Sequence, residues 1–161
     1  MLRILAMIGG VSGAAGLSQF PEFSQQYLQR LAGKVDALTA VVADFDASAD
    51  ENGLSRDAAL AELSGTPFLE DRQNDLRRSF ADHARLSSDL AQLRAASPLQ
   101  RLTMPQRLDD LETLQAAWAD FRPAIPATLD GAVTAGIGYI SGWGLVAGLL
   151  SLLAWPFRRR A

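Results

Sequence analysis

Long stretches without charge lie near both ends of the chain. They cover residues 4–21 and 131–157, which are 18 and 27 residues long. A helix of about 20 predominantly apolar residues crosses a bilayer. The second stretch is long enough to cross with tilt, and the first reaches this length when residues 1–20 are counted together. We therefore expect transmembrane helices over residues 1–20 and 126–157.

The region between them, residues 21–125, has the hydrophobic pattern of packed helices. Apolar residues recur at spacings of three and four from Leu28 to Phe45, the a/d pattern of a helix with one buried face. A second stripe runs from Leu69 to Leu93. Because short connections favour antiparallel neighbours, the two stripes are expected to pack as a hairpin. No run of alternating β-branched or aromatic residues predicts a strand.

Capping and turn residues predict where these helices begin and end. The polar run Asp46–Gly53 predicts a loop, after which Ser55 can cap a short helix over residues 56–64. Thr66 and Pro67 suit the first turn of a longer helix that runs to about residue 96.

A last helix is expected before the C-terminal apolar segment. Thr103 and Gln106 have the spacing of a capping box at its start, and Pro123 ends it. Its apolar stripe is expected to consist of Leu108, Leu111, Leu114 or Gln115, Trp118 and Phe121.

Charge separates the middle region from the two ends. All 18 acidic residues and 11 of the 15 basic ones lie within residues 22–130, which therefore carry a net charge of −7. This balance argues against a nucleic-acid-binding protein, which would present a basic face. Arg3 and the cluster Arg158–Arg160 are the only charges outside that region.

Basic flanks favour the cytoplasmic side of a membrane. We therefore expect a bacterial inner-membrane protein with both termini in the cytoplasm, a basic tail over residues 158–161 and a periplasmic middle region. The predicted fold is all-α, with two transmembrane helices flanking an extracytoplasmic helical hairpin or bundle.

The N-terminal segment also fits a signal peptide. Arg3 would be its basic region, residues 4–17 its apolar region, and residues 13–15 its small-residue cleavage site. Cleavage would leave a secreted helical protein with a C-terminal anchor. The helical spacing of the small residues favours an uncleaved helix that packs closely against another.

Glycines mark the faces at which the membrane helices are expected to pack. On the C-terminal segment they fall on two faces, which suits two neighbours: the first segment of the same chain, and a second copy or a partner. The expected helix-packing residues are Gly9, Gly10, Gly13, Gly16, Gly138, Gly142, Gly144 and Gly148. The expected interfacial anchors are Arg3, Trp155, Arg158, Arg159 and Arg160.

Few residues suggest a catalytic or metal-binding role. Cysteine is absent, which excludes disulfides, thiolate metal sites and cysteine nucleophiles. His83, the single histidine, lies three residues from both Phe80 and Leu86 and is therefore expected at the edge of a helix-packing face. We predict no catalytic residue, no cofactor and no metal site.

Three strings carry a resemblance to a known family. They are GGVSGAAGLSQFPEFSQQYLQRLAG at residues 9–33, GTPFL at 65–69 and GYISGWG at 138–144. The chain resembles a family of short proteobacterial membrane proteins that is classed as a domain of unknown function. The resemblance covers nearly the whole chain and implies two uncleaved membrane helices around a helical middle. It implies no activity, cofactor or catalytic residue.

The expected function is that of a non-enzymatic interaction or scaffold protein in a membrane. It would self-associate or serve as an accessory subunit of a larger membrane complex, with the lipid bilayer and membrane proteins as its partners. The alternative is an oligomeric pore or transport element, which usually has polar or ionisable residues at mid-depth. The C-terminal segment offers only Thr134, Ser141 and Ser151, with Tyr139, for that purpose.

Overall fold

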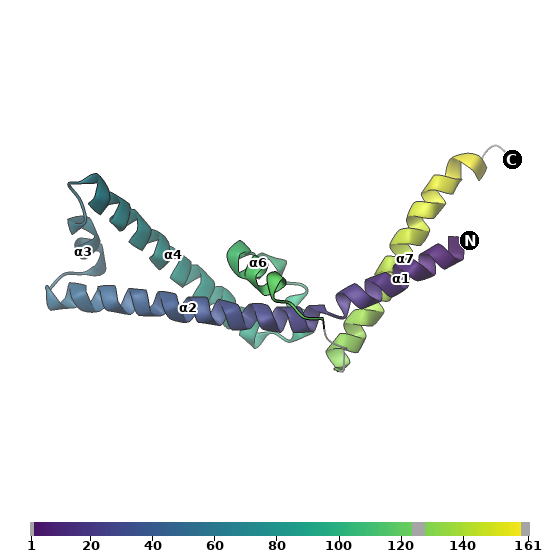
Figure 1. Cartoon of the computed structure of the whole chain (residues 1–161), viewed down its shortest axis with the longest axis horizontal. Helices are drawn as coiled ribbons and strands as arrows, with labels where there is room; N and C mark the ends of the chain where they lie inside the picture. Colours follow the sequence, from purple (N-terminus) through teal and green to yellow (C-terminus); the bar gives the residue numbers. More distant parts are fainter. Residues whose placement is uncertain (1, 124–127, 159–161) are drawn as a thin grey trace.

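The computed structural model describes residues 2–123 and 128–158, and within those ranges every regular element is helical. An elongated molecule results, with α1 and α7 side by side at one end and α2 extending to the other (Figure 1). Its elements are α1 (Leu2–Leu17), α2 (Phe20–Glu51), α3 (Arg56–Glu62), α4 (Pro67–Ala95), α5 (Pro98–Arg101), the 3-10 turn η1 (Pro105–Arg107), α6 (Leu111–Ala119) and α7 (Leu129–Arg158).

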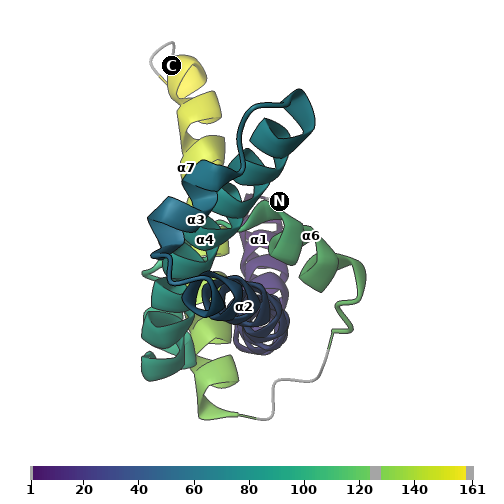
Figure 2. The same cartoon turned by 90° about the vertical axis from the view of Figure 1, so that its left-hand side faces the viewer.

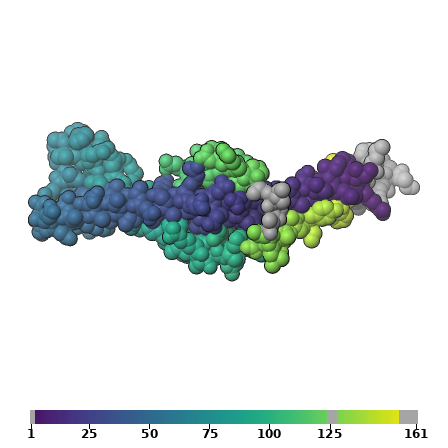
Figure 3. All heavy atoms as spheres, turned by 60° about the horizontal axis from the view of Figure 1, so that its bottom comes forward, coloured from purple at the N-terminus to yellow at the C-terminus, as the bar shows by residue number. Residues whose placement is uncertain are grey.

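The all-α class is confirmed, and so is the presence of two helical stretches long and apolar enough to cross a membrane. One begins at Arg3 and continues through α2, and the other covers Leu129–Leu153. The space-filling view shows the molecule widening where the teal and green segments of the middle region pack beside α2 (Figure 3).

Pro21 separates α1 from α2. Its nitrogen cannot donate to the carbonyl of Leu17, and its ring clashes with a helical carbonyl four residues earlier. The helix accordingly ends at Leu17, and Phe20 begins the next one. As a result α1 is 16 residues long, about 24 Å, and is shorter than the helix over residues 1–20 that we expected.

The predicted loop over Asp46–Gly53 is wrong, because α2 continues to Glu51. Ser48 donates a hydrogen bond back to the Asp44 carbonyl at 3.0 Å, so this polar side chain bonds within the helix. Ala49 is buried, which adds packing to a segment that looks solvent-exposed from its composition. The chain turns only at Gly53, whose φ of +67° favours glycine.

The caps of the next helices lie largely where the sequence places them. The Ser55 hydroxyl accepts from the Ala58 N–H, and the Thr66 hydroxyl accepts from the Leu69 N–H, each at 3.3 Å. The capping box expected at Thr103 and Gln106 is wrong. It forms instead at Ser97, with Gln100 returning the second hydrogen bond at 2.8 Å, because Pro98 starts a separate helical turn there.

The core of the middle region lies where α2 and α4 pack as an antiparallel pair. Phe45 meets Phe80 edge-on at 5.3 Å between ring centroids, and Leu31 and Leu93 are fully buried towards the other end. The central cluster consists of Tyr27, Leu28, Leu31, Val35, Leu86, Leu90, Leu93 and Ala117. The two stripes read from the sequence thus provide most of this core.

Tyr27 is the largest fully buried side chain in that cluster. Its hydroxyl forms no hydrogen bond with any of the described residues. Burial raises the pKa of Tyr27 to about 12, so the phenol stays neutral at physiological pH.

The buried face of α6 differs from the predicted stripe. Thr113 and Ala117 are the buried residues of this helix, whereas Leu111 and Trp118 are 63% and 71% exposed. The small Ala117 lets α6 approach α2 closely, and this orientation leaves Leu111 and Trp118 on the outer side. Viewed along the long axis, α4 and α6 lie on different sides of α2 (Figure 2).

Ion pairs fix the start of α6 against α2. Asp110 caps α6 by accepting from the Thr113 N–H at 3.1 Å, and it receives Lys34 Nζ at 3.0 Å. Burial opposes ionisation of Asp110, but the hydrogen bonds from Thr113 and Lys34 outweigh it and lower the pKa of the carboxyl group. A further ion pair, at 2.6 Å, joins Arg107 of η1 to Asp89 of α4.

The negative charge of the molecule is concentrated at the end of α2 that lies far from α1 and α7. Residues 44–71, which include α3 and the start of α4, hold eight acidic residues and one arginine, a net charge of −7. The other residues between positions 22 and 130 hold ten acidic and ten basic side chains. We call residues 44–71 the acidic tip; in Figure 1 they occupy the left-hand end.

Candidate membrane hairpin and adjoining groove

The two apolar helices pack against each other in opposite directions. Gly9 of α1 lies against Gly142 of α7, and one turn later Gly13 lies against Gly138. The N-terminal end of α1 and the C-terminal end of α7 therefore lie at the same end of the pair (Figure 1). We call this pair of helices the hairpin.

Glycine is required along this seam because the two backbones touch. A Cβ atom added to Gly13 would collide with the carbonyl oxygen of Gly138, and the reverse substitution would collide as well. A Cβ on Gly9 would lie 2.9 Å from the Gly142 oxygen. Helices in lipid associate through such close backbone contact, since apolar burial drives them little there.

Other side chains complete the seam. A Cβ on Gly10 would lie 2.8 Å from the Tyr139 ring, and Ala6 is buried one turn earlier. Thr134 is fully buried, and its hydroxyl donates to the carbonyls of Asp130 and Gly131 at 2.9 and 3.0 Å. Its polarity is thus satisfied within α7.

Three of the eight expected packing glycines lie away from the seam. A Cβ on Gly16, Gly144 or Gly148 would meet no atom within 4 Å. Gly144 and Gly148 share a second, open face of α7 with the exposed Ser141 and Ser151. The hairpin thus uses one of the two small-residue faces and leaves the other uncovered.

The outward faces of the hairpin are apolar. On α1 the exposed large residues are Ile4, Leu5, Met7, Ile8 and Val11. On α7 they are Leu129, Val133, Ile137, Tyr139, Ile140, Trp143, Leu145, Leu149, Leu152 and Leu153. Soluble monomers rarely expose a continuous apolar surface of this extent.

Of the expected interfacial anchors, Arg3, Trp155 and Arg158 lie in helix ends at the shared end of the hairpin. Arg3 is exposed near the start of α1, while Trp155 and Arg158 belong to the end of α7. Arg159 and Arg160 lie outside the described residues, as do the side chains of Trp155 and Arg158.

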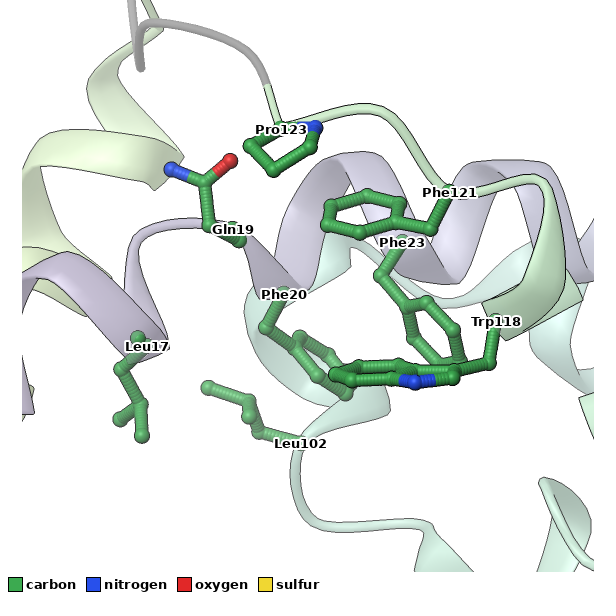
Figure 4. A pocket seen from close by; sticks show the side chains of 9 residues that line it. Leu17, Gln19, Phe20, Phe23, Leu102, Trp118, Phe121 and Pro123 are labelled. Carbon is green, nitrogen blue, oxygen red and sulfur yellow. The ribbon is translucent and has the colours of Figure 1, made fainter.

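A groove of about 530 Å³ opens at the other end of the hairpin, beside the start of α2. Figure 4 shows Leu17, Phe20, Leu102 and Trp118 around this space, drawn from three separate segments of the chain. The remaining lining residues are Gly16, Gln19, Phe23, Phe121 and Pro123.

Aromatic packing shapes the groove wall. Phe23 of α2 meets the Trp118 ring edge-on at 5.8 Å and the Phe121 ring at 5.7 Å. The Trp118 and Phe121 rings are stacked at 6.2 Å. These contacts hold the end of α6 against the start of α2, so the wall comprises elements far apart in sequence.

Two arginines lie in the segments that line the groove. Arg101, next to Leu102, is buried; its Nε donates to the Leu93 carbonyl at 2.9 Å and thereby satisfies a carbonyl in the last turn of α4. Arg122, between Phe121 and Pro123, is exposed and forms no ion pair with a described residue.

Sequence reasoning missed this groove. Phe20, Phe23, Trp118 and Phe121 were available as a signal, since aromatic residues next to a membrane segment are typical of an interface. The sequence shows them as two pairs about 95 residues apart, however, and the predicted stripe assigned Trp118 to a buried face.

His83 has a structural role between α2 and α4. The Thr39 hydroxyl donates to the Val35 carbonyl at 2.8 Å, so it accepts a hydrogen bond from Nε2 of His83 at 3.0 Å. The imidazole therefore joins the two helices of the core, as expected for a residue at the edge of a packing face.

The comparison with protein families supports the resemblance to a domain-of-unknown-function family. No match was found among curated proteins or among solved structures. One family model covers residues 1–159, nearly the whole chain, and its description is "Protein of unknown function (DUF2937)". By the extent of this match, the chain belongs to the DUF2937 family.

Proposed function

We propose that this chain is a non-enzymatic integral membrane protein that acts as an interaction or scaffold protein. The hairpin crosses the bacterial inner membrane, both termini lie in the cytoplasm, and α2 to α6 form a periplasmic domain. The chain self-associates or joins a larger membrane complex through the uncovered face of α7.

The observation that carries this proposal is the two-sided character of the hairpin. Its inner seam is closed by glycine backbone contacts, while its outer faces present large apolar side chains. Lipid tails suit such faces, whereas water does not. The packing of α1 on α7 along its length also supports an α1 that is retained rather than cleaved as a signal peptide.

Charge supports the orientation. The antiparallel seam puts Arg3 at the same end as the C-terminus of α7, which the cluster Arg158–Arg160 follows. The positive-inside rule assigns that end to the cytoplasm.

The polar groups of the middle region support a structural role. Asp110 caps α6 and pairs with Lys34, while Asp89 pairs with Arg107. The groove wall is formed chiefly by hydrocarbon, with Gln19 as its polar side chain. Such a surface binds apolar groups rather than a reacting polar substrate.

Reporter fusions test the orientation. A reporter that is active only in the periplasm should work when it is inserted at Asn52, in the turn after α2, because this turn lies at the far end of the molecule from the hairpin. The same reporter fused after Ala161 should be inactive. The reverse pattern would overturn the orientation, and activity at both sites would indicate a single span.

Substitution at Gly144 tests self-association. Gly144→Leu places a large side chain on the uncovered face of α7, so it should shift the complex towards monomer in native mass spectrometry from a gentle detergent. Gly136→Leu is the matched control, because Gly136 also has open space around it but lies off that face. Equal assembly of both variants, or a wild-type chain that is monomeric and alone, would contradict the proposed use of this face.

A further inference from the structure

We propose that the groove between α1, α2 and α6 binds one acyl chain of a phospholipid from the periplasmic leaflet, with the lipid phosphate near Arg122. This inference rests on the proposed membrane location and extends it to a specific lipid site. It follows from the depth of the groove in the proposed bilayer, its continuity with the apolar surface of α1, and the exposed Arg122 that follows Phe121 in the sequence.

The length of α1 determines the depth of the groove in the proposed bilayer. A hydrocarbon core is about 30 Å thick, whereas the 16 residues of α1 give about 24 Å. If Arg3 lies at the cytoplasmic interface, 20 residues are required to reach the other side, and these end at Phe23. The groove, lined by Gly16, Leu17, Phe20 and Phe23, therefore lies at the periplasmic boundary of the bilayer.

The groove is continuous with the surface that faces lipid. Gly16 and Leu17 are the last residues of α1 and also belong to the groove wall. A lipid tail lying along the outside of α1 could therefore enter without crossing water. Hydrocarbon and aromatic rings make up most of the wall, which suits an alkyl chain, and the volume is in the range of small-molecule sites.

Two exposed side chains near the groove, Trp118 and Arg122, have the chemistry to contact a lipid headgroup. Trp118 is 71% exposed, and its indole N–H donates to none of the described residues. Such an amphipathic ring is typical of the headgroup level of a membrane. Arg122 is exposed and directly follows Phe121, a residue of the groove wall, in the sequence. Its guanidinium group can donate hydrogen bonds to a phosphate.

The fluorescence of Trp118 can report lipid binding in the groove. In a full-length chain carrying Trp143→Phe and Trp155→Phe, Trp118 is the remaining tryptophan. This chain, in detergent micelles, is titrated with phosphatidylglycerol whose acyl chains carry bromine, which quenches indole fluorescence on contact. We expect quenching that saturates near one lipid per chain and that unbrominated phosphatidylglycerol reverses.

Gly16 allows the groove to be blocked without disturbing the hairpin. A Cβ atom added there would meet no protein atom within 4 Å, and Gly16 lines the groove. Gly16→Phe should abolish the saturable quenching and leave the melting temperature unchanged. Gly136→Phe should retain the saturable quenching, because Gly136 also has open space around it but lies on α7. Arg122→Gln should raise the half-saturating lipid concentration about 5-fold, the effect of one basic residue at a lipid headgroup.

The failures of the two proposals can be told apart. A chain that stays in the membrane after an alkaline carbonate wash, but whose quenching is unsaturable or equal in the Gly16→Phe and Gly136→Phe variants, rejects the groove as a lipid site. An unchanged half-saturation for Arg122→Gln rejects the assigned phosphate position. A chain that carbonate releases from the membrane rejects the proposed membrane location itself.

Discussion

Gly138→Leu is expected to force α1 and α7 apart. A Cβ at this position collides with the backbone of Gly13 and lies 2.9 Å from the Leu17 Cβ, so no rotamer of a larger side chain fits. Overpacking of this kind costs about 1–3 kcal/mol even where neighbours can adjust. Backbone atoms adjust less readily than side chains, so we expect the upper part of this range or more.

Distance measurements between spin labels can detect the separation. The chain lacks cysteine, so labels can be placed on cysteines introduced at Ile8 and Leu145, which are exposed on α1 and α7. The distance between them should increase in Gly138→Leu and remain unchanged in Gly136→Leu. An identical distance in both variants would show that the glycine seam does not hold the hairpin together.

Leu31→Asp should unfold the helices of the middle region. Leu31 is fully buried in the cluster formed by α2, α4 and α6. Truncation of a buried leucine to alanine already costs about 2–5 kcal/mol, and a carboxylate adds the cost of burying an unpaired charge. That sum is comparable with the whole stability of a typical domain, which is about 5–15 kcal/mol.

Thermal melting by circular dichroism measures this effect in the detergent-purified chain. Leu111→Asp is the matched control, because Leu111 is 63% exposed and lies in the first turn of α6, where a carboxylate is favourable. The control should melt as the wild type does. If Leu31→Asp melts at the same temperature as the control, the cluster around Leu31 is not the core of this domain.

Local sequence signals were sufficient where the structure depends on local chemistry. The caps at Ser55 and Thr66 follow from one side chain and the next turn of helix, so they could be predicted. The stripes that build the α2 and α4 core could be predicted too, since both faces are continuous in the sequence.

The features that sequence reasoning missed depend on distant partners. Residues 46–51 look like a loop by composition, but the structure makes them helical and buries Ala49. Leu111 and Trp118 look like core residues, but Asp110 and Lys34 orient α6 so that they face outward. The groove requires segments about 100 residues apart to meet, which no local pattern reports.

In the proposed membrane orientation, the acidic tip affects how the middle region is held relative to the bilayer. The 32 residues of α2 give a rod of about 48 Å, so an upright molecule holds the tip well beyond the Debye length of about 8 Å. There, anionic headgroups exert almost no force on the seven net negative charges of residues 44–71. If the rod leans over, those charges enter the screened layer and are repelled, at about 1 kcal/mol for each charge near the surface. Under the proposed orientation, we expect this repulsion to keep α2 away from the bilayer surface, and we expect higher salt to weaken it.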